Sequence, residues 1–348
     1  MSRFLLLLLA QVALPLLSAR ASSEVKEPTC LDVDGYDVCH YKGALVEVTQ
    51  RRSEDRLDIS DLDLLAIRAD AFKNVTATHL YLNQGNRISV LKRESFRGLP
   101  NLERLHLDGN VVPLSAHLFA ELGRLQSLSL ILNKINSVPK DSFAGLSNLT
   151  WLYLGLNDIE AIEADSFANL NPELLYLWLN DNKISRVAPG SFAGLAELNR
   201  LHLDRNRLES LSGGTFRGLS KLEDLFLNDN RITSVSRALL RDLVGLKRLY
   251  LQQNEISVLE PETFAELSQL EQLRLDGNKL SHIVVGTFAG LSNLQDLRLS
   301  DNSIRALDNG AFADFVKLRL LHFGGNNLTE IDKGTSGLPQ RTTVITTP

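Results

Sequence analysis

A sequence repeat of 24 residues dominates this chain of 348 residues and limits the folds that it can adopt. Each copy follows the frame Leu-x-x-Leu-x-Leu-x-x-Asn, with another apolar residue two positions later, as in Leu102 to Val112 and Leu149 to Ile159. Arrays of this kind grow along one axis, so the repeat predicts a solenoid in place of two globular domains. The frame's asparagines are Asn110, Asn133, Asn157, Asn182, Asn206, Asn230, Asn254, Asn278, Asn302 and Asn326.

The Leu-x-Leu part of each copy predicts a short strand with one buried face, because its residues alternate between leucine and variable types. Neighbouring copies would place these strands side by side in a parallel sheet, with the leucines in the core. We expect each asparagine to bond backbone groups that the turn after the strand leaves unpaired. Asparagines from successive copies should then form a ladder.

A phenylalanine follows most of these asparagines by ten residues and predicts a second row of buried side chains. The usual setting is Ser/Thr-Phe-x-Gly-Leu, as in Ser142 to Leu146, and Leu240 replaces the phenylalanine once. We expect the rings to stack as a spine on the side opposite the sheet. The members are Phe96, Phe119, Phe143, Phe167, Phe192, Phe216, Phe264, Phe288 and Phe312.

Together these motifs resemble the typical class of extracellular leucine-rich repeats, over roughly four fifths of the chain. The resemblance implies an α/β solenoid: a curved horseshoe with a parallel concave sheet and an irregular, phenylalanine-spined convex side. Members of this class often have a four-cysteine cap at the N-terminus and a cysteine-rich cap at the C-terminus. This chain has only two cysteines, so the resemblance assigns no subfamily.

Four segments are expected along the chain. Residues 1–21 combine Arg3, a short apolar run and Ala19-Arg-Ala21, the pattern of a cleaved secretory signal peptide. Residues 22–55 should form an N-terminal cap, residues 56–332 about 11–12 repeats, and residues 333–348 a threonine-rich tail without a predicted fold. No stretch is apolar for long enough to suggest a membrane span.

Two further features fit an extracellular, secreted protein. Cys30 and Cys39 lie nine positions apart and are expected to form one local disulfide in an oxidising compartment. Asn-x-Thr sequons, which are acceptors for N-linked glycans, begin at Asn74, Asn148 and Asn327.

The predicted cap contains two turn signals. The alternating run from Tyr41 to Val48 predicts a hairpin that turns at Lys42-Gly43. The acidic segment from Asp32 to Asp37 has Gly35 at its fourth position, whereas an EF-hand loop needs glycine at the sixth. We therefore interpret this segment as an Asp-Gly turn, and we expect no metal site there.

No residue pattern indicates catalysis. The sequence lacks the hydrolase, metalloprotease and phosphate-loop motifs, so we expect no enzyme and no cofactor. His106, His202 and His322 occupy the same frame position in distant copies and cannot share a metal in a regular array. The formal charge of −5 and the absence of a Lys/Arg block argue against a nucleic-acid partner.

Aromatic residues gather at the variable strand positions, which face away from the core because side chains alternate along a strand. These residues, called the aromatic patch below, are Trp151, Tyr153, Tyr176, Trp178, His202, Phe226 and Tyr250. They include both tryptophans of the chain. Arg200 and Arg248 are expected to flank the patch and to orient a partner.

The aromatic patch has two interpretations. Tyrosine, tryptophan and phenylalanine stabilise sheets by cross-strand stacking without any ligand. They also anchor protein interfaces, and a contiguous cluster favours that use. We predict a secreted protein-binding or scaffold protein that recognises a protein partner on its concave face. The alternatives are a non-catalytic accessory subunit of a secreted enzyme, or a receptor ectodomain that lacks its anchor.

Overall fold

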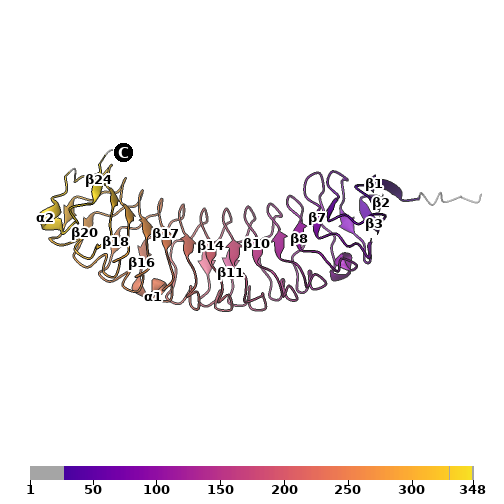
Figure 1. Cartoon of the computed structure of the whole chain (residues 1–348), viewed down its shortest axis with the longest axis horizontal. Coiled ribbons are helices and arrows are strands. Elements are labelled where there is room, and N and C mark those ends of the chain that lie inside the picture. Colours follow the sequence, from indigo (N-terminus) through magenta and orange to yellow (C-terminus); the bar gives the residue numbers. More distant parts are fainter. Residues whose placement is uncertain (1–26, 329, 347–348) are drawn as a thin grey trace, which may run out of the picture.

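The computed structural model describes residues 27–328 and 330–346, so the predicted signal peptide lies outside the described residues. The described residues form a curved solenoid (Figure 1). It runs from strands β1 (Thr29–Val33), β2 (Tyr36–Tyr41) and β3 (Ala44–Gln50) at one end to β24 (Thr343–Ile345) at the other.

A sheet of 13 strands runs along the solenoid, and each pair of neighbours is parallel. Most strands are three residues long with a buried leucine at the centre, as the alternation predicts. The strands follow one another in sequence order and therefore continue the same register from coil to coil. Before β24 they are β4 (Arg56–Asp58), β7 (His79–Tyr81), β8 (Arg104–His106), β9 (Ser127–Ser129), β10 (Trp151–Tyr153), β12 (Tyr176–Trp178), β14 (Arg200–His202), β15 (Asp224–Phe226), β17 (Arg248–Tyr250), β19 (Gln272–Arg274), β21 (Asp296–Arg298) and β23 (Leu320–His322).

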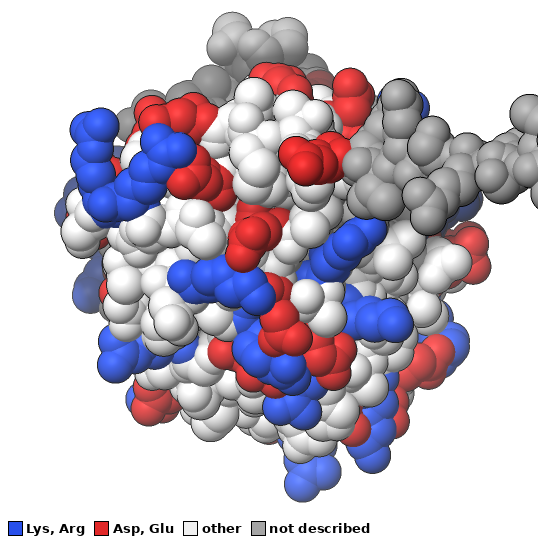
Figure 2. Space-filling view, turned by 90° about the vertical axis from the view of Figure 1, so that its right-hand side faces the viewer, with Lys and Arg blue, Asp and Glu red and all other residues white. Residues whose placement is uncertain are grey.

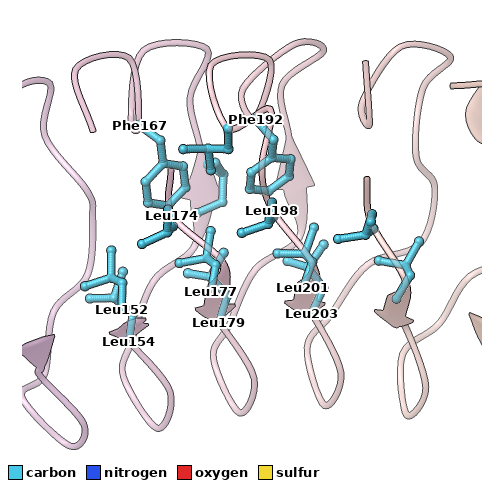
Figure 3. Close-up of a cluster of buried hydrophobic side chains, with 14 of the residues drawn as sticks. Leu152, Leu154, Phe167, Leu174, Leu177, Leu179, Phe192, Leu198, Leu201 and Leu203 are labelled. Atoms are coloured by element: carbon cyan, nitrogen blue, oxygen red, sulfur yellow. The ribbon is translucent and has the colours of Figure 1, made fainter. Parts of the chain in front are cut away.

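The core consists of leucine columns beneath the sheet and a row of phenylalanine rings behind them (Figure 3). Ring centroids lie 6.4 Å apart for Phe143 and Phe167, and 5.8 Å apart for Phe167 and Phe192. The predicted phenylalanine spine is therefore confirmed. It is interrupted at Leu240, which is 1% exposed and ends the short helix α1 (Arg237–Leu240), on the outer side of the arc in Figure 1.

The predicted asparagine ladder is also confirmed. The Asn206 side-chain amide donates to the carbonyl oxygens of Leu179 at 2.9 Å and Leu203 at 3.0 Å. Its oxygen accepts from the backbone N–H of Ile184 at 3.0 Å. Each asparagine thus joins its own coil to the preceding one and satisfies buried backbone groups that the turn would leave without partners.

The side opposite the sheet contains only short elements. They include parallel pairs of two-residue strands, such as β11 (Ala161–Ile162) with β13 (Arg186–Val187). The others are β5 (Ala66–Ile67), β6 (Phe72–Lys73), β16 (Ser234–Val235), β18 (Val258–Leu259), β20 (His282–Ile283), β22 (Ala306–Leu307) and the 3₁₀ helix η1 (Arg93–Phe96). This agrees with the irregular convex side that the resemblance implies.

The N-terminal end of the core is covered by the antiparallel strands β1, β2 and β3. Two-residue turns join them at Asp34-Gly35 and Lys42-Gly43, where all four residues have positive φ, the geometry that hairpin turns favour. Cys30 and Cys39 are paired in register on β1 and β2 and form a disulfide. The Arg51 guanidinium donates hydrogen bonds to the carboxylates of Asp32 and Asp37.

The prediction of a tail without a fold is wrong for its described residues. Helix α2 (Lys333–Ser336) begins after Asp332, whose carboxylate accepts from the backbone N–H of Gly334 at 2.7 Å. Strand β24 then pairs with β23 as the last strand of the sheet, and Leu338 is 2% exposed. The repeat pattern misses this coil because its strand has no Leu-x-Leu and no asparagine follows it.

Candidate functional site on the concave sheet

Five residues of the aromatic patch form one continuous stack across five neighbouring strands. The ring centroids of Tyr153 and Trp178 lie 4.2 Å apart, and those of Trp178 and His202 5.6 Å apart. Phe226 follows at 3.9 Å from His202, and Tyr250 at 4.4 Å from Phe226. Strands in register are about 4.8 Å apart, so equivalent side chains of adjacent strands reach stacking distance. We call this stack the aromatic ladder.

The two other members of the patch lie beside the ladder. Trp151 stacks on Tyr176 with a centroid distance of 5.8 Å, and Tyr176 also contacts Trp178. The Arg200 guanidinium lies over the Tyr176 ring at 5.8 Å. The structure therefore brings all seven predicted aromatic residues together in one surface.

The ladder residues are partly buried, because each inner ring has a neighbouring ring on both sides. Burial raises the pKa of Tyr153, and burial together with the charge of Asp224 raises the pKa of Tyr250. The Tyr250 hydroxyl donates to Gln272 at 3.3 Å. Neighbouring side chains thus bury much of the area of each ring, and less ring area is exposed to a partner than the sequence indicates.

Arg200 and Arg248 bind the same internal carboxylate. Asp224 lies between them on β15 and is 1% exposed. Arg200 approaches it at 2.8 Å, and Arg248 donates to it at 2.7 Å. This bond raises the pKa of Arg248. The main ionic partner of these arginines is thus Asp224, and their role in orienting a partner stays a prediction.

Most of the positive charges of the concave face are paired with carboxylates. His202 lies 3.0 Å from the carboxylate of Asp204, which is 4% exposed and also pairs with Arg205. Arg274 pairs with Asp276, and Arg298 with Asp296. From β8 to β21 the concave positions carry as many aspartates as arginines: Asp108, Asp204, Asp224, Asp276 and Asp296 beside Arg104, Arg200, Arg248, Arg274 and Arg298.

A hollow of about 440 Å³ lies at the N-terminal border of the aromatic patch, and the sequence reasoning missed it. It exists because β9 has the small residues Ser127 and Ser129 where the neighbouring strands have large ones. Two serines at both variable positions of one strand are a signal that comparison of the copies could have found. The hollow, called the notch below, is lined by Arg104, His106, Asp108, Ser127, Ser129, Ile131, Trp151 and Tyr153.

The N-terminal end of the solenoid shows no concentration of one charge in the view of Figure 2. Figure 2 views the N-terminal end of the solenoid, where Lys/Arg and Asp/Glu side chains are interspersed. Within residues 27–328 and 330–346 there is no group of three or more His, Cys, Asp or Glu that could hold a metal ion. None of the helices in these ranges has the length and apolarity needed to cross a bilayer. The sequon residues Asn74, Asn148 and Asn327 are exposed.

Comparison with known proteins gives one family and several structural neighbours. The family model described as "Leucine rich repeat" matches residues 55–112, 111–159, 148–208, 196–256, 227–280 and 273–328. A curated relative, leucine-rich repeat transmembrane protein FLRT2 of Mus musculus, is 31% identical over 119 residues. That match covers 33% of this chain and 14% of the relative's length.

Two solved structures are similar over 79% of this chain. The structure of a TLR13–ssRNA13 complex has a TM-score of 0.69 and 28% identity, with 40% of that chain covered. An octameric complex of latrophilin 3, Unc5D and FLRT2 has a TM-score of 0.65 and 26% identity, with 84% of the matched chain covered.

Proposed function

Because this chain belongs to the leucine-rich-repeat family, we propose that it is an extracellular protein-binding module whose concave aromatic patch contacts a protein partner. The observation that carries the proposal is the contiguous set of seven aromatic residues on one face. Stacking explains part of this set, but it does not require both tryptophans of the chain to lie on adjacent strands. Aromatic clusters at the centre of a concave surface are typical binding hot spots.

The FLRT2 neighbour, solved together with latrophilin 3 and Unc5D, supports a protein as the partner class. The TLR13 neighbour was solved with ssRNA13 and raises the alternative of a nucleic acid. We favour a protein because four of the five concave arginines, Arg200, Arg248, Arg274 and Arg298, are ion-paired with aspartates, whereas a phosphate backbone needs unbalanced positive charge.

The test compares wild type with the double variant Trp178→Ala/Tyr153→Ala. Both proteins would be immobilised and exposed to extracellular proteins of the source organism, and the proteins bound by wild type would be identified and their Kd measured. We expect the double variant to weaken binding at least 100-fold, since two hot-spot residues each contribute about 2 kcal/mol or more. Unchanged affinity in a folded double variant would exclude the patch as the site.

Tyr81→Ala is the matched control. Tyr81 occupies the same strand position on β7 and stacks on His106 at 4.6 Å, but it lies outside the patch. Its removal costs a similar stacking contact and should leave affinity within about threefold of wild type. Equal losses in Tyr81→Ala and the double variant would indicate a structural effect and contradict the proposal.

The compartment is part of the same proposal. FLRT2 is by its name a transmembrane protein, which makes a receptor ectodomain the second candidate beside a secreted protein. The exposure of Asn74, Asn148 and Asn327 supports glycosylation at these positions. Expression in secreting cells, followed by enzymatic glycan removal and mass measurement of each Asn→Gln variant, tests occupancy. The full-length transcript distinguishes a secreted form from an anchored one.

A further inference from the structure

The notch between β8 and β10 contains an exposed positive charge, Arg104, and is followed by a loop with exposed leucines. At the first strand position, Arg104 pairs in register with His79 on one side and Ser127 on the other, and neither carries a negative charge. No ion pair of Arg104 is present among the described residues. In contrast to Arg200 and Arg248, this guanidinium is exposed and available to an anion.

The one carboxylate of the notch is already satisfied. Asp108 accepts from the Ser129 hydroxyl and, at 3.0 Å, from the backbone N–H of Ile131. The His106 ring nitrogen lies 3.8 Å from it. Asp108 therefore holds the loop after β9 in place, and the uncompensated charge of the notch is the positive charge of Arg104.

The loop next to the notch, after the lining residue Ile131, has exposed apolar side chains and a strained backbone. Leu132 follows the lining residue Ile131, and Leu156 occupies the equivalent position in the next coil. The two side chains are 56% and 47% exposed. Their φ values are 57° and 56°, a left-handed conformation that is costly for leucine. In later coils this position holds residues that tolerate exposure, among them Asp181, Arg205, Asp229, Gln253, Gly277 and Asp301.

Exposed leucines in a strained conformation cost stability, and such features cluster at binding sites. Arg104 and these leucines lie at different ends of the strands, since Leu132 follows Ser127, the register partner of Arg104, by five residues. The aromatic wall of Trp151 and Tyr153 lies along one side between them.

We propose that the notch receives a short extended segment of the protein partner, with an acidic residue at Arg104 and an apolar residue at Leu132 and Leu156. This inference rests on the proposed function and names the chemistry of the segment that the concave face recognises. The volume of about 440 Å³ is within the range of sites that enclose small ligands or anchoring side chains.

The experiment uses a displayed library of random linear peptides, selected on the whole chain. Three variants separate binding from folding. Ser127→Trp fills the notch at a strand position where the next two strands have Trp151 and Tyr176, so the fold should accept it. Arg104→Glu reverses the charge. Leu132→Asp introduces a residue that the same position already has at Asp181, so it should preserve or raise the unfolding midpoint while removing the apolar contact.

We expect the enriched peptides to carry Asp or Glu at a fixed offset from a large apolar residue. Ser127→Trp, Arg104→Glu and Leu132→Asp should each weaken these peptides at least tenfold, and selection on Arg104→Glu should replace the acidic residue by Lys or Arg. Gln253→Asp, in the same column but distant from the notch, is the control and should leave binding unchanged.

Two results would overturn the inference: no enrichment, or peptides that bind wild type and Ser127→Trp equally well. If the selected peptides tolerate Ser127→Trp but are lost in Trp178→Ala, the aromatic patch remains the site and only the notch proposal fails. If the selected peptides bind Ser127→Trp and Trp178→Ala as tightly as wild type, the proposed function fails as well.

Discussion

Replacing Asn206 by alanine tests the energetic account of the solenoid. The Leu179 carbonyl keeps a second partner in Asn182, at 3.1 Å, and the Leu203 carbonyl keeps Asn230, at 3.0 Å. The backbone N–H of Ile184 loses its acceptor and remains buried. An orphaned buried donor costs about 1–3 kcal/mol, and two further lost hydrogen bonds cost about 1 kcal/mol each. The expected loss of unfolding free energy is therefore about 3–5 kcal/mol.

Asn228→Ala is a matched control for this prediction. Asn228 and Asn206 are both 8% exposed, but the Asn228 amide donates only to the Asp229 side chain, at 2.6 Å. Its replacement should cost about 0.5–1.5 kcal/mol. Urea unfolding followed by circular dichroism gives both values, provided that the slope of the transition is unchanged. If the two variants differ by less than about 1 kcal/mol, burial of the amide and not its position in the ladder explains the stability, and the reasoning is refuted.

Three further predictions concern the spine, the cap and the ladder. Phe216→Ala should lower the unfolding free energy by about 3–5 kcal/mol, because the ring is fully buried and stacks on Phe192. Phe216→Leu, which copies the native Leu240, should lower it clearly less. Thermal unfolding measures both variants, and equal losses would contradict a packed spine. Reducing the Cys30–Cys39 disulfide should destabilise the cap by about 2.5 kcal/mol from the loss of loop closure alone. Hydrogen exchange should then accelerate in the cap, while the central repeats keep their protection. Exchange that accelerates throughout the chain would refute this local role. Tyr153 and Tyr250 have raised pKa values, so the unfolded chain ionises first and stability should fall as pH rises above 10.0. Burial also raises the pKa of Tyr36, so an ultraviolet titration of Tyr153→Phe/Tyr250→Phe should lose part of its late-ionising component and keep the part due to Tyr36; an unaltered titration would count against burial of the Tyr153 and Tyr250 hydroxyls.

The repeat fold could be predicted from the sequence because each column of the frame has one physical role. The strand leucines, the asparagine and the phenylalanine recur in register, so an error at one copy is corrected by its neighbours. The last coil could not be predicted, because Leu338 and β24 carry no such pattern and are positioned by pairing with β23.

The candidate site was predictable in position but not in its interactions. Alternation along the strands places Trp178 and Tyr153 on the concave face without any structural information. Which charges remain available depends on rotamers: Arg248 turns to Asp224, while Arg104 has no acidic neighbour on the adjoining strands. The small residues Ser127 and Ser129 can be found by comparing the copies, but the volume and the lining of the notch follow only once the adjacent side chains are placed.

The two rows of stacked rings differ in spacing, as the curvature of the molecule requires. Ring centroids in the aromatic ladder are separated by 3.9 to 5.6 Å, whereas the stacked pairs of the phenylalanine spine are separated by 5.8 to 6.5 Å. Every coil is therefore wider on its convex side than on its concave side, and successive coils together form a curved solenoid. A side chain on the convex side, such as Phe192 or Leu240, consequently influences the curvature of the concave face without contacting the partner.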